Sequence, residues 1–202
     1  MNSLDQYLIS SGVLRTPEII DAFSQADRIH FVLPKYQELA YEDIPIPIGG
    51  GQTISQPTTV AFMLELLQPR VGENILDVGS GSGWTTALLS YIVGGKGSVT
   101  GTEIIPELVS FGQQNILRQD LPQAKILKST GDLGYKEKAP YNKILVSASA
   151  ADLPKGLVSQ LGNGGRMVIP IGDSIWEINK DQDGKIEKRE YPGFLFVPLI
   201  QR

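Results

Sequence analysis

The clearest chemical signal in the sequence is a glycine-rich run, DVGSGSGW at residues 77–84. It follows an apolar run at residues 74–78 that predicts a buried strand, and it precedes a helical pattern that begins at Trp84. Glycines at such a junction let the backbone pass close to a ligand at the carboxyl end of a parallel sheet. A tight strand–helix turn is the alternative, but three glycines in five residues exceed what a turn needs.

The spacing of these glycines selects among nucleotide ligands. A dinucleotide fingerprint, G-x-G-x-x-G, would need its third glycine where Trp84 stands, and no Lys-Ser or Lys-Thr pair follows to make a phosphate-binding loop. The pattern is G-x-G-x-G, preceded by Asp77. S-adenosylmethionine fits this pattern, because it has no phosphate and carries cationic amino and sulfonium groups. We therefore predict that it is bound by Gly79, Ser80, Gly81 and, directly or through water, by Asp77.

Two further acidic residues follow predicted strands. Glu103 ends the strand at residues 98–103 and is placed to accept hydrogen bonds from both ribose hydroxyls, as an acid at a similar distance does in dinucleotide folds. Asp132, followed by Leu133, comes after the next strand and is expected to accept from the adenine amino group. A solvated strand-end glutamate and an ordinary Gly-Asp turn are the alternatives.

The residue inventory excludes several kinds of site. The chain of 202 residues has no cysteine, which excludes disulfide scaffolds, thiolate zinc sites, iron–sulfur clusters and a cysteine nucleophile. A single histidine, His30, excludes multi-histidine metal centres, so no metal site is predicted. His30 is expected to be a surface or helix-end residue.

Charge and hydropathy restrict the partners. The net charge of −4 and the pI of about 5.1 argue against duplex nucleic-acid binding, which usually needs a basic face. No apolar run approaches the roughly 18 residues that span a bilayer. Residues 1–6 lack the basic and apolar regions of a signal peptide. We therefore expect a cytoplasmic monomer without nucleic-acid or membrane partners.

The first 70 residues or so are expected to be helical, with a Gly/Pro-rich interruption. Thr16 is placed to cap a helix that begins at Pro17. Alternate prolines and three consecutive glycines at residues 45–51 exclude a helix and favour an extended edge or loop. Another helix is expected from about Pro57.

From residue 71 onward, short apolar strands alternate with helices. A helix at Trp84 is expected to bury one face, and residues 162–165 are expected to form a turn. Parallel βαβ units closed by an antiparallel hairpin predict one α/β domain, 1–202, with residues 1–70 as a cover and 71–202 as the ligand-binding core. The expected strands are 74–78, 98–103, 124–128, 143–146, 166–171 and 194–199, the expected helices begin near residues 84 and 106 and cover 154–161, and the hairpin joins 174–179 to 185–189.

A set of longer motifs extends this interpretation. The most specific are DR at residues 27–28, FV at 31–32, AYEDIPIPIG at 40–49 and GQTISQP at 51–57. The glycine loop supports them, as do shorter matches such as GGR at residues 164–166 and FVPL at 196–199. With these motifs the chain resembles the protein-L-isoaspartate (D-aspartate) O-methyltransferase family over nearly its whole length.

The resemblance implies a Rossmann-like methyltransferase sandwich with a mixed sheet. It implies methylation of the free carboxylate of L-isoaspartyl residues in damaged proteins and peptides, with S-adenosyl-L-homocysteine as product and a succinimide on the way to repair. It also implies that Gln52, Thr53, Ile54 and Ser55 border cofactor and substrate, with Ser55 as the catalytic residue that hydrogen-bonds near the reacting carboxylate. Because Ser55 lies two residues before Pro57, a plain helix N-cap is its alternative role.

Three segments depart from the family pattern. Asp132 runs directly into Leu133 and Gly134, which shortens the turn expected near the adenine; Asn142 stands where the family usually has an aspartate; and a glycine-rich segment is reduced to residues 172–174. The departures near Asp132 and Asp173 motivate a related carboxyl methyltransferase that acts on another peptide carboxylate. A protein that binds S-adenosylmethionine without turnover is the non-enzymatic alternative.

Overall fold

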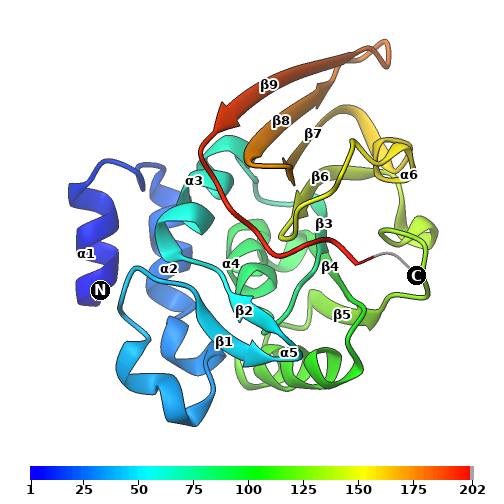
Figure 1. Ribbon diagram of the computed structural model, residues 1–202. Coiled ribbons are helices and arrows are strands. Elements are labelled where there is room, and N and C mark those ends of the chain that lie inside the picture. The colour runs from blue at the N-terminus through cyan, green and yellow to red at the C-terminus, as the bar shows by residue number, and fades with distance from the viewer. Residues whose placement is uncertain (201–202) are drawn as a thin grey trace.

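A seven-stranded sheet forms the centre of the molecule (Figure 1), and its strand order is β5-β4-β3-β6-β7-β8-β9. The computed structural model describes residues 1–200. Strands β3 to β7 pair in parallel, and β8 and β9 close the sheet as an antiparallel hairpin, so the predicted mixed, mostly parallel sheet is confirmed. The strands are β3 Asn74–Val78, β4 Ser98–Glu103, β5 Ala124–Lys128, β6 Tyr141–Val146, β7 Leu161–Ile171, β8 Ser174–Lys180 and β9 Ile186–Pro192.

The helices alternate with these strands and also fill the N-terminal part of the chain. The α-helices are α1 Ser3–Ser10, α2 Pro17–Gln25, α3 Pro57–Leu67, α4 Trp84–Val93, α5 Pro106–Arg118 and α6 Lys155–Val158. Short 3-10 helices are η1 Arg28–Phe31, η2 Pro34–Leu39, η3 Gly94–Lys96 and η4 Lys136–Lys138. Helices α3, α4 and α5 contribute to one buried cluster, and α6 contributes to a second.

The strand order changes direction at β3. From β3 the chain moves outward through β4 to β5, and it then returns to place β6 on the other side of β3. Asp77 of β3 consequently has Gly101 of β4 and Leu145 of β6 as its register partners. Ligands of open parallel sheets bind outside the carboxyl ends of the strands at such a reversal. The loop after β3 therefore lies where a ligand site is expected.

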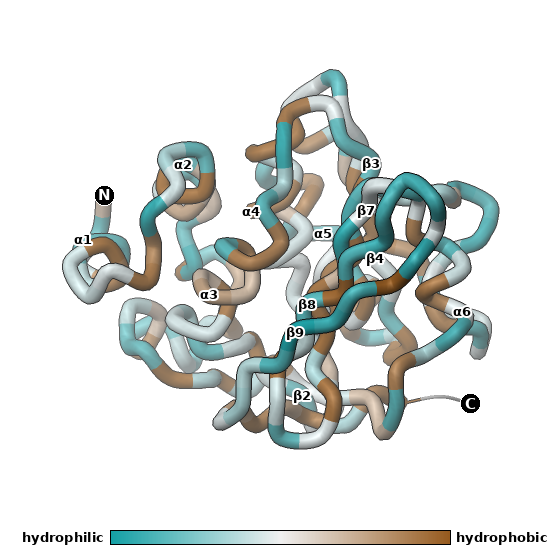
Figure 2. Tube along the Cα trace, turned by 90° about the horizontal axis from the view of Figure 1, so that it is seen from above, coloured by the Kyte–Doolittle hydropathy of each residue, from teal (hydrophilic) through white to brown (hydrophobic). Residues whose placement is uncertain are grey.

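Alternate residues of β3 face two different cores. Ile75 belongs to the cluster that includes α3, α4 and α5, whereas Leu76 and Val78 belong to the second cluster, which includes Leu157 of α6. Burial of both faces is typical of a central parallel strand. The outer strand β9 is largely hydrophilic (Figure 2), which protects this sheet edge from pairing with another chain.

Several predicted boundaries are wrong. Residues 194–199 form no strand: their bridge to the rest of the chain joins Pro198 to Ser149, and Pro198 has no N–H to extend a ladder. Helix α6 is shorter than predicted. The Gly156 carbonyl accepts a hydrogen bond from the Gln160 side chain, whereas the Gln160 backbone N–H donates to Leu157. Residues 162–165 belong to β7 rather than to a turn. Helix α4 is buried nearly all round, because α2 packs against it as well as the sheet.

The Gly/Pro-rich interruption is a β-hairpin, which agrees with the predicted extended conformation. Its strands are β1 Ile46–Gly49 and β2 Gln52–Ile54, and the glycines at 49, 50 and 51 have φ angles of 104°, 59° and 74°. Gly50 packs so closely on Ile105 that an added Cβ would lie 3.1 Å from its Cδ1 atom. This contact holds the hairpin tip against the N-cap residue of α5.

The first two helices are tied to α3 by a buried carboxylate. Glu65 accepts hydrogen bonds from the backbone N–H groups of Arg15 and Thr16 and from the Thr16 hydroxyl, each at 2.7 Å. Thr16 is the N-cap residue of α2, as predicted, but its side chain makes no bond to that helix. The expected capping bond is therefore wrong, since the hydroxyl serves Glu65 instead.

Candidate active site

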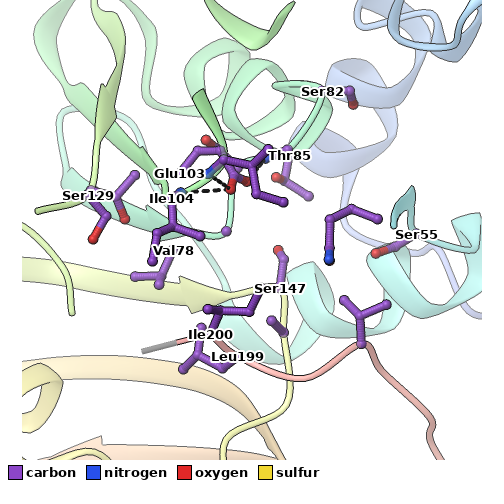
Figure 3. A pocket seen from close by; sticks show the side chains of 18 of the residues that line it. Ser55, Val78, Ser82, Thr85, Glu103, Ile104, Ser129, Ser147, Leu199 and Ile200 are labelled. Carbon is purple, nitrogen blue, oxygen red and sulfur yellow. Dashed lines mark hydrogen bonds between the residues drawn. The ribbon is translucent and has the colours of Figure 1, made fainter. Parts of the chain in front are cut away.

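A pocket opens at the carboxyl edge of the sheet, between the glycine loop, the β1–β2 hairpin and the C-terminal segment (Figure 3). Its empty volume is about 820 Å³ with the open mouth included. The lining comes from segments far apart in sequence, namely residues 48, 52–55, 78–82, 84–85, 102–105, 129, 133–134, 147–148 and 197–200.

The glycine loop follows β3 and lines this pocket with its backbone. Gly79, Gly81 and Gly83 have φ angles of 79°, 50° and 84°, a region that side chains disfavour. The N–H groups of Gly79 and Ser80 both donate to the Thr102 carbonyl, at 2.8 and 3.1 Å. These bonds fold the loop back over the end of β4. Ser80 is 3% exposed, and its hydroxyl is buried without a hydrogen-bond partner within residues 1–200.

Glu103 is fixed at the end of β4 by three backbone donors. Its Oε1 accepts from the N–H groups of Ile104 and Ile105, at 2.7 and 2.9 Å, and its Oε2 accepts from Gly81 at 3.0 Å. The side chain lines the pocket and is only 6% exposed, so a purely solvated role is wrong. A carboxylate offers about four lone-pair sites, and one therefore remains on Oε2 for a ligand.

Asp77 lies behind the pocket rather than on its surface. Its Oδ2 accepts from the hydroxyls of Thr85 and Thr86, at 2.8 and 2.6 Å, and its Oδ1 has no partner among the described residues. Burial raises the pKa of Asp77 to about 6, the two threonine bonds lower it, and the charge of Glu103 raises it. Thr85 itself lines the pocket, so a hydroxyl stands between Asp77 and any ligand.

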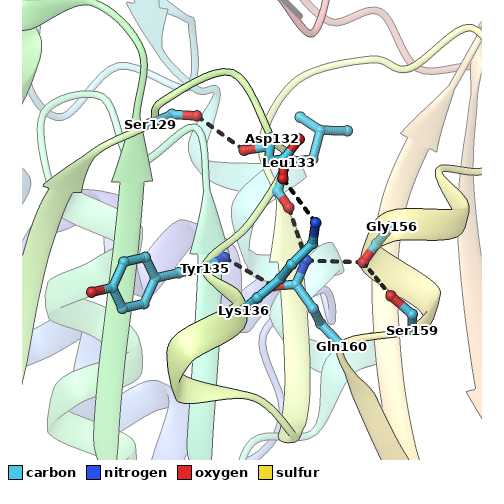
Figure 4. A network of polar contacts seen from close by, with 8 residues as sticks. All are labelled: Ser129, Asp132, Leu133, Tyr135, Lys136, Gly156, Ser159 and Gln160. Atoms are coloured by element: carbon cyan, nitrogen blue, oxygen red, sulfur yellow. Dashed lines mark hydrogen bonds and ion pairs between the residues drawn. The ribbon is translucent and has the colours of Figure 1, made fainter.

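Asp132 lies outside the pocket lining. Its side chain is 78% exposed and pairs with Lys136 at 2.8 Å, which lowers the pKa of Asp132. The neighbouring Leu133 and Gly134 line the pocket instead. Their turn is shaped by Gln160, which donates to the Leu133 carbonyl and accepts from the Tyr135 N–H, both at 2.8 Å (Figure 4).

The β1–β2 hairpin brings its second strand to the pocket. Gln52, Thr53, Ile54 and Ser55 all contribute to the lining. Figure 3 shows Ser55 on the side of the pocket away from Ser129 and Glu103. The N-cap of α3 is Gln56, so the alternative in which Ser55 caps that helix is wrong.

The helix is capped instead by an acid from earlier in the chain. Asp43 accepts from the backbone N–H of Thr58 at 2.8 Å, from the Thr58 hydroxyl at 2.7 Å and from the Gln56 amide at 3.1 Å. The carboxylate thus does the work that a local Ser or Asp usually does at a helix start. Ser55 keeps its hydroxyl free of a capping bond.

Several lining residues were not predicted. Ser129 and Ser147 directly follow β5 and β6, and the rule that ligands bind beyond the carboxyl ends of parallel strands could have identified both. The C-terminal residues 197–200 also line the pocket. They are held by bonds from Ser149 N–H to the Val197 carbonyl and from Leu199 N–H to the Ser149 carbonyl, each 2.8 Å. No local pattern in the sequence indicates this long-range contact.

The remaining predicted residues and departures lie away from the pocket. His30 is exposed, as expected, with its Nδ1 atom 3.4 Å from the Gln119 amide. The Asn142 side chain accepts from the N–H of Asn74 at 2.8 Å, at the amino ends of β3 and β6, so this departure does not touch the pocket. Residues 1–200 hold no cluster of acidic or histidine side chains that could bind a metal. No helix in that range is long and apolar enough to cross a membrane.

The comparison with known proteins decides the family. The model of the family "Protein-L-isoaspartate(D-aspartate) O-methyltransferase (PCMT)" matches residues 1–202. The chain belongs to this family. It is 43% identical over 202 residues to the protein-L-isoaspartate O-methyltransferase of Methanopyrus kandleri, covering 98% of this chain and 89% of that one. The corresponding protein of Pyrococcus abyssi is 42% identical over 200 residues, with coverages of 96% and 92%.

A solved relative supports the same assignment. The protein-L-isoaspartate O-methyltransferase of Plasmodium falciparum, crystallised with S-adenosyl-L-homocysteine, superposes with a TM-score of 0.87 at 28% identity and covers 99% of this chain and 98% of its own. The resemblance inferred from the sequence motifs, and with it the methyltransferase fold, is confirmed.

Replacing Gly112 with alanine is expected to weaken binding of S-adenosylmethionine. Gly112 of α5 packs on the glycine loop, and an added Cβ would lie 2.9 Å from the Gly81 carbonyl oxygen and 2.8 Å from Ile126 Cδ1. Overpacking of this kind costs roughly 1–3 kcal/mol, and a tenfold rise in Kd corresponds to about 1.4 kcal/mol. We expect a rise of about tenfold in a calorimetric titration. Gly156→Ala, where the added Cβ meets open space, is the control and should leave Kd unchanged.

Binding of the same ligand is expected to weaken as the pH falls through about 6. The folded pKa of Asp77 lies above its ordinary value, so the free protein takes up this proton as the pH drops below about 6 and loses negative charge behind the pocket. Calorimetry between about pH 5 and pH 8 measures the effect. Asp77→Asn should bind weakly with a flat profile over this range; a wild-type affinity that does not change with pH would contradict the prediction.

Proposed function

We propose that this chain transfers a methyl group from S-adenosylmethionine to the free carboxylate of L-isoaspartyl residues in damaged proteins and peptides. The observation that carries the proposal is one pocket lined jointly by the glycine loop, Glu103 and Ser55. Family membership over the whole chain supports it. The ester would then close to a succinimide, which reopens partly to normal aspartate.

The residues at the glycine loop suit S-adenosylmethionine. Glu103 has an acceptor site left on Oε2 for a ribose hydroxyl, and Gly79, Ser80 and Gly81 line the pocket beside it. Asp77 supplies negative charge behind Thr85 for the cationic part of the ligand, with that hydroxyl as the intermediary. Leu133, rather than the exposed Asp132, borders the pocket on the side of β5. When bound, the cofactor supplies a methyl group on a sulfonium.

The residues at Ser55 suit a carboxylate nucleophile. Such a group has a reference pKa of about 3.3–3.9, so it is ionised at neutral pH and needs no general base. The leaving thioether is neutral and needs no general acid. Ser55 would donate one hydrogen bond to a carboxylate oxygen and orient the other towards the methyl group. Orientation of this kind supplies roughly 7–11 kcal/mol in favourable cases.

The N-terminal cover would contact the substrate carboxylate. Within residues 1–200, the pocket lining includes no Lys, Arg or His, so a substrate carboxylate meets hydroxyls and backbone groups rather than a cation. A strong cationic partner would lower its nucleophilicity. We propose that residues 1–70 form this cover, with residues 52–55 as the part in contact with both ligands.

Methyl transfer to an isoaspartyl peptide, measured beside its aspartyl twin, tests the proposed function. With labelled S-adenosylmethionine, we expect base-labile label on the isoaspartyl peptide alone. Equal labelling of both peptides would favour a related carboxyl methyltransferase with another substrate. Labelling of neither, with cofactor binding intact in calorimetry, would favour a binding protein without turnover.

Ser55→Ala is expected to lower kcat for the isoaspartyl peptide by about 10–100-fold, because misplacement of a reacting group by about 1 Å costs that order of rate. The affinity for S-adenosylmethionine should change much less. Steady-state kinetics and calorimetry measure the two effects separately. Ser110→Ala, on the exposed face of α5, is the control. The opposite result, lost affinity with kcat retained, would place Ser55 in the cofactor site alone.

A further inference from the structure

Arg28 is a buried cation without an anionic partner. Its side chain is 2% exposed, and no carboxylate within residues 1–200 lies in ion-pair contact with it. Burial lowers the pKa of Arg28 to about 10, while the charge of Asp43 raises it. A buried guanidinium is costly unless its donors are hydrogen-bonded. Both terminal nitrogens of Arg28 are bonded, whereas its Nε has no partner within residues 1–200.

Those hydrogen bonds all go to the segment that leads to Ser55. One terminal nitrogen, Nη1, donates to the carbonyls of Ala40 and Glu42, both at 3.1 Å. The other, Nη2, donates to the carbonyl of Ile44 at 2.8 Å and to that of Ser55 at 3.0 Å. A planar guanidinium fixes the directions of its donors. It therefore holds Ser55 at a set distance from residues 40–44.

The same guanidinium touches the first residue of α4. Its central carbon lies 5.3 Å from the centre of the Trp84 ring, within the range of a cation–π contact. Trp84 lines the pocket directly after the glycine loop, and its indole N–H donates to the Ala26 carbonyl at 2.9 Å. Arg28 thus contacts both sides of the pocket, the hairpin side through Ser55 and the glycine-loop side through Trp84.

We propose that Arg28 is a positioning residue for methyl transfer, which sets the place of Ser55 relative to the glycine loop. The inference rests on the proposed role of Ser55. Arg28 does not line the pocket, so it acts through the Ser55 backbone rather than on the substrate. Lysine cannot replace it, because a point charge on a flexible stem lacks the forked donors that reach four carbonyls.

A double-mutant cycle tests the inference. Arg28→Lys is expected to lower kcat by about 10–100-fold, with little change in calorimetric S-adenosylmethionine affinity, because Ser55 is displaced. In the Ser55→Ala background the same change should lower kcat by no more than about twofold, because the Ser55 hydroxyl that Arg28 positions is already absent. A factor of about two is the scatter expected for mutations that do not interact. A purely structural arginine would cost the same in both backgrounds, and that result overturns the proposal.

Glu65→Gln is the matched control for stability. Glu65 is likewise a buried charge that binds backbone groups of the cover, but it holds residues 15 and 16, away from Ser55. We expect it to lower the midpoint of urea unfolding and leave kcat unchanged at temperatures where the protein is folded. If Arg28→Lys behaves in the same way, with lost stability and a retained kcat, the inference is wrong.

The outcomes also separate this inference from the proposed function. If Ser55→Ala lowers kcat but Arg28→Lys leaves kcat unchanged, the inference is overturned and the proposed function stands. A harmless Ser55→Ala overturns the proposed role of Ser55 and positioning through it. Should Arg28→Lys not fold, Arg28→Gln, whose amide keeps two donors, carries the same cycle.

Discussion

The loops around the pocket contain backbone groups that no sheet or helix satisfies, and buried charged side chains satisfy them. A backbone N–H or carbonyl buried without a partner costs as much as a lost hydrogen bond. Arg28 donates hydrogen bonds to four carbonyls of residues 40–55. Glu103 accepts hydrogen bonds from three backbone N–H groups, those of Gly81, Ile104 and Ile105. Because each group makes several bonds at once, it restrains several loop positions relative to one another.

The same constraint explains why helix α5 has a glycine, Gly112, where it packs on the glycine loop. The loop is folded back onto the Thr102 carbonyl, which brings it against α5. Only a residue without a side chain fits there, and Gly112 leaves space for the Gly81 carbonyl. The cost of glycine within a helix is roughly 0.5–1 kcal/mol relative to alanine. The loop held in this way donates the Gly81 N–H to Glu103, and so the cofactor side of the pocket depends on α5.

The sequence predicted the parts of the fold and site that depend on local pattern. Apolar runs and the rule for parallel sheets predicted that the glycine loop and Glu103 follow strands at the carboxyl edge of the sheet, and both lie there. Contacts across long stretches of chain were not predictable in this way. Asp132 turned outward to Lys136, and residues 197–200 joined the pocket through Ser149.

The failures have a common physical origin. A short segment has many nearly equal conformations, and a distant partner selects among them. The Thr16 hydroxyl makes no capping bond to α2 because it donates to Glu65, 49 residues away. Ser55 caps no helix: the N-cap of α3 is Gln56, and Asp43 accepts from the Thr58 N–H at the start of that helix. A motif can therefore show which residues matter in a segment without showing which atoms they bind.

The chemistry of the reaction explains why so few acid–base groups are needed. The nucleophile arrives already ionised, and the leaving group takes no proton, so a pocket without histidine loses nothing; His30 lies at the surface. What methyl transfer does need is alignment of three atoms in a line, which depends on the rigidity of the walls rather than on their pKa values. Arg28 and Asp77 lie behind the walls, where they bind loop carbonyls and threonine hydroxyls, Glu103 lines the cofactor side, and the lining residues 52–55 carry no charge.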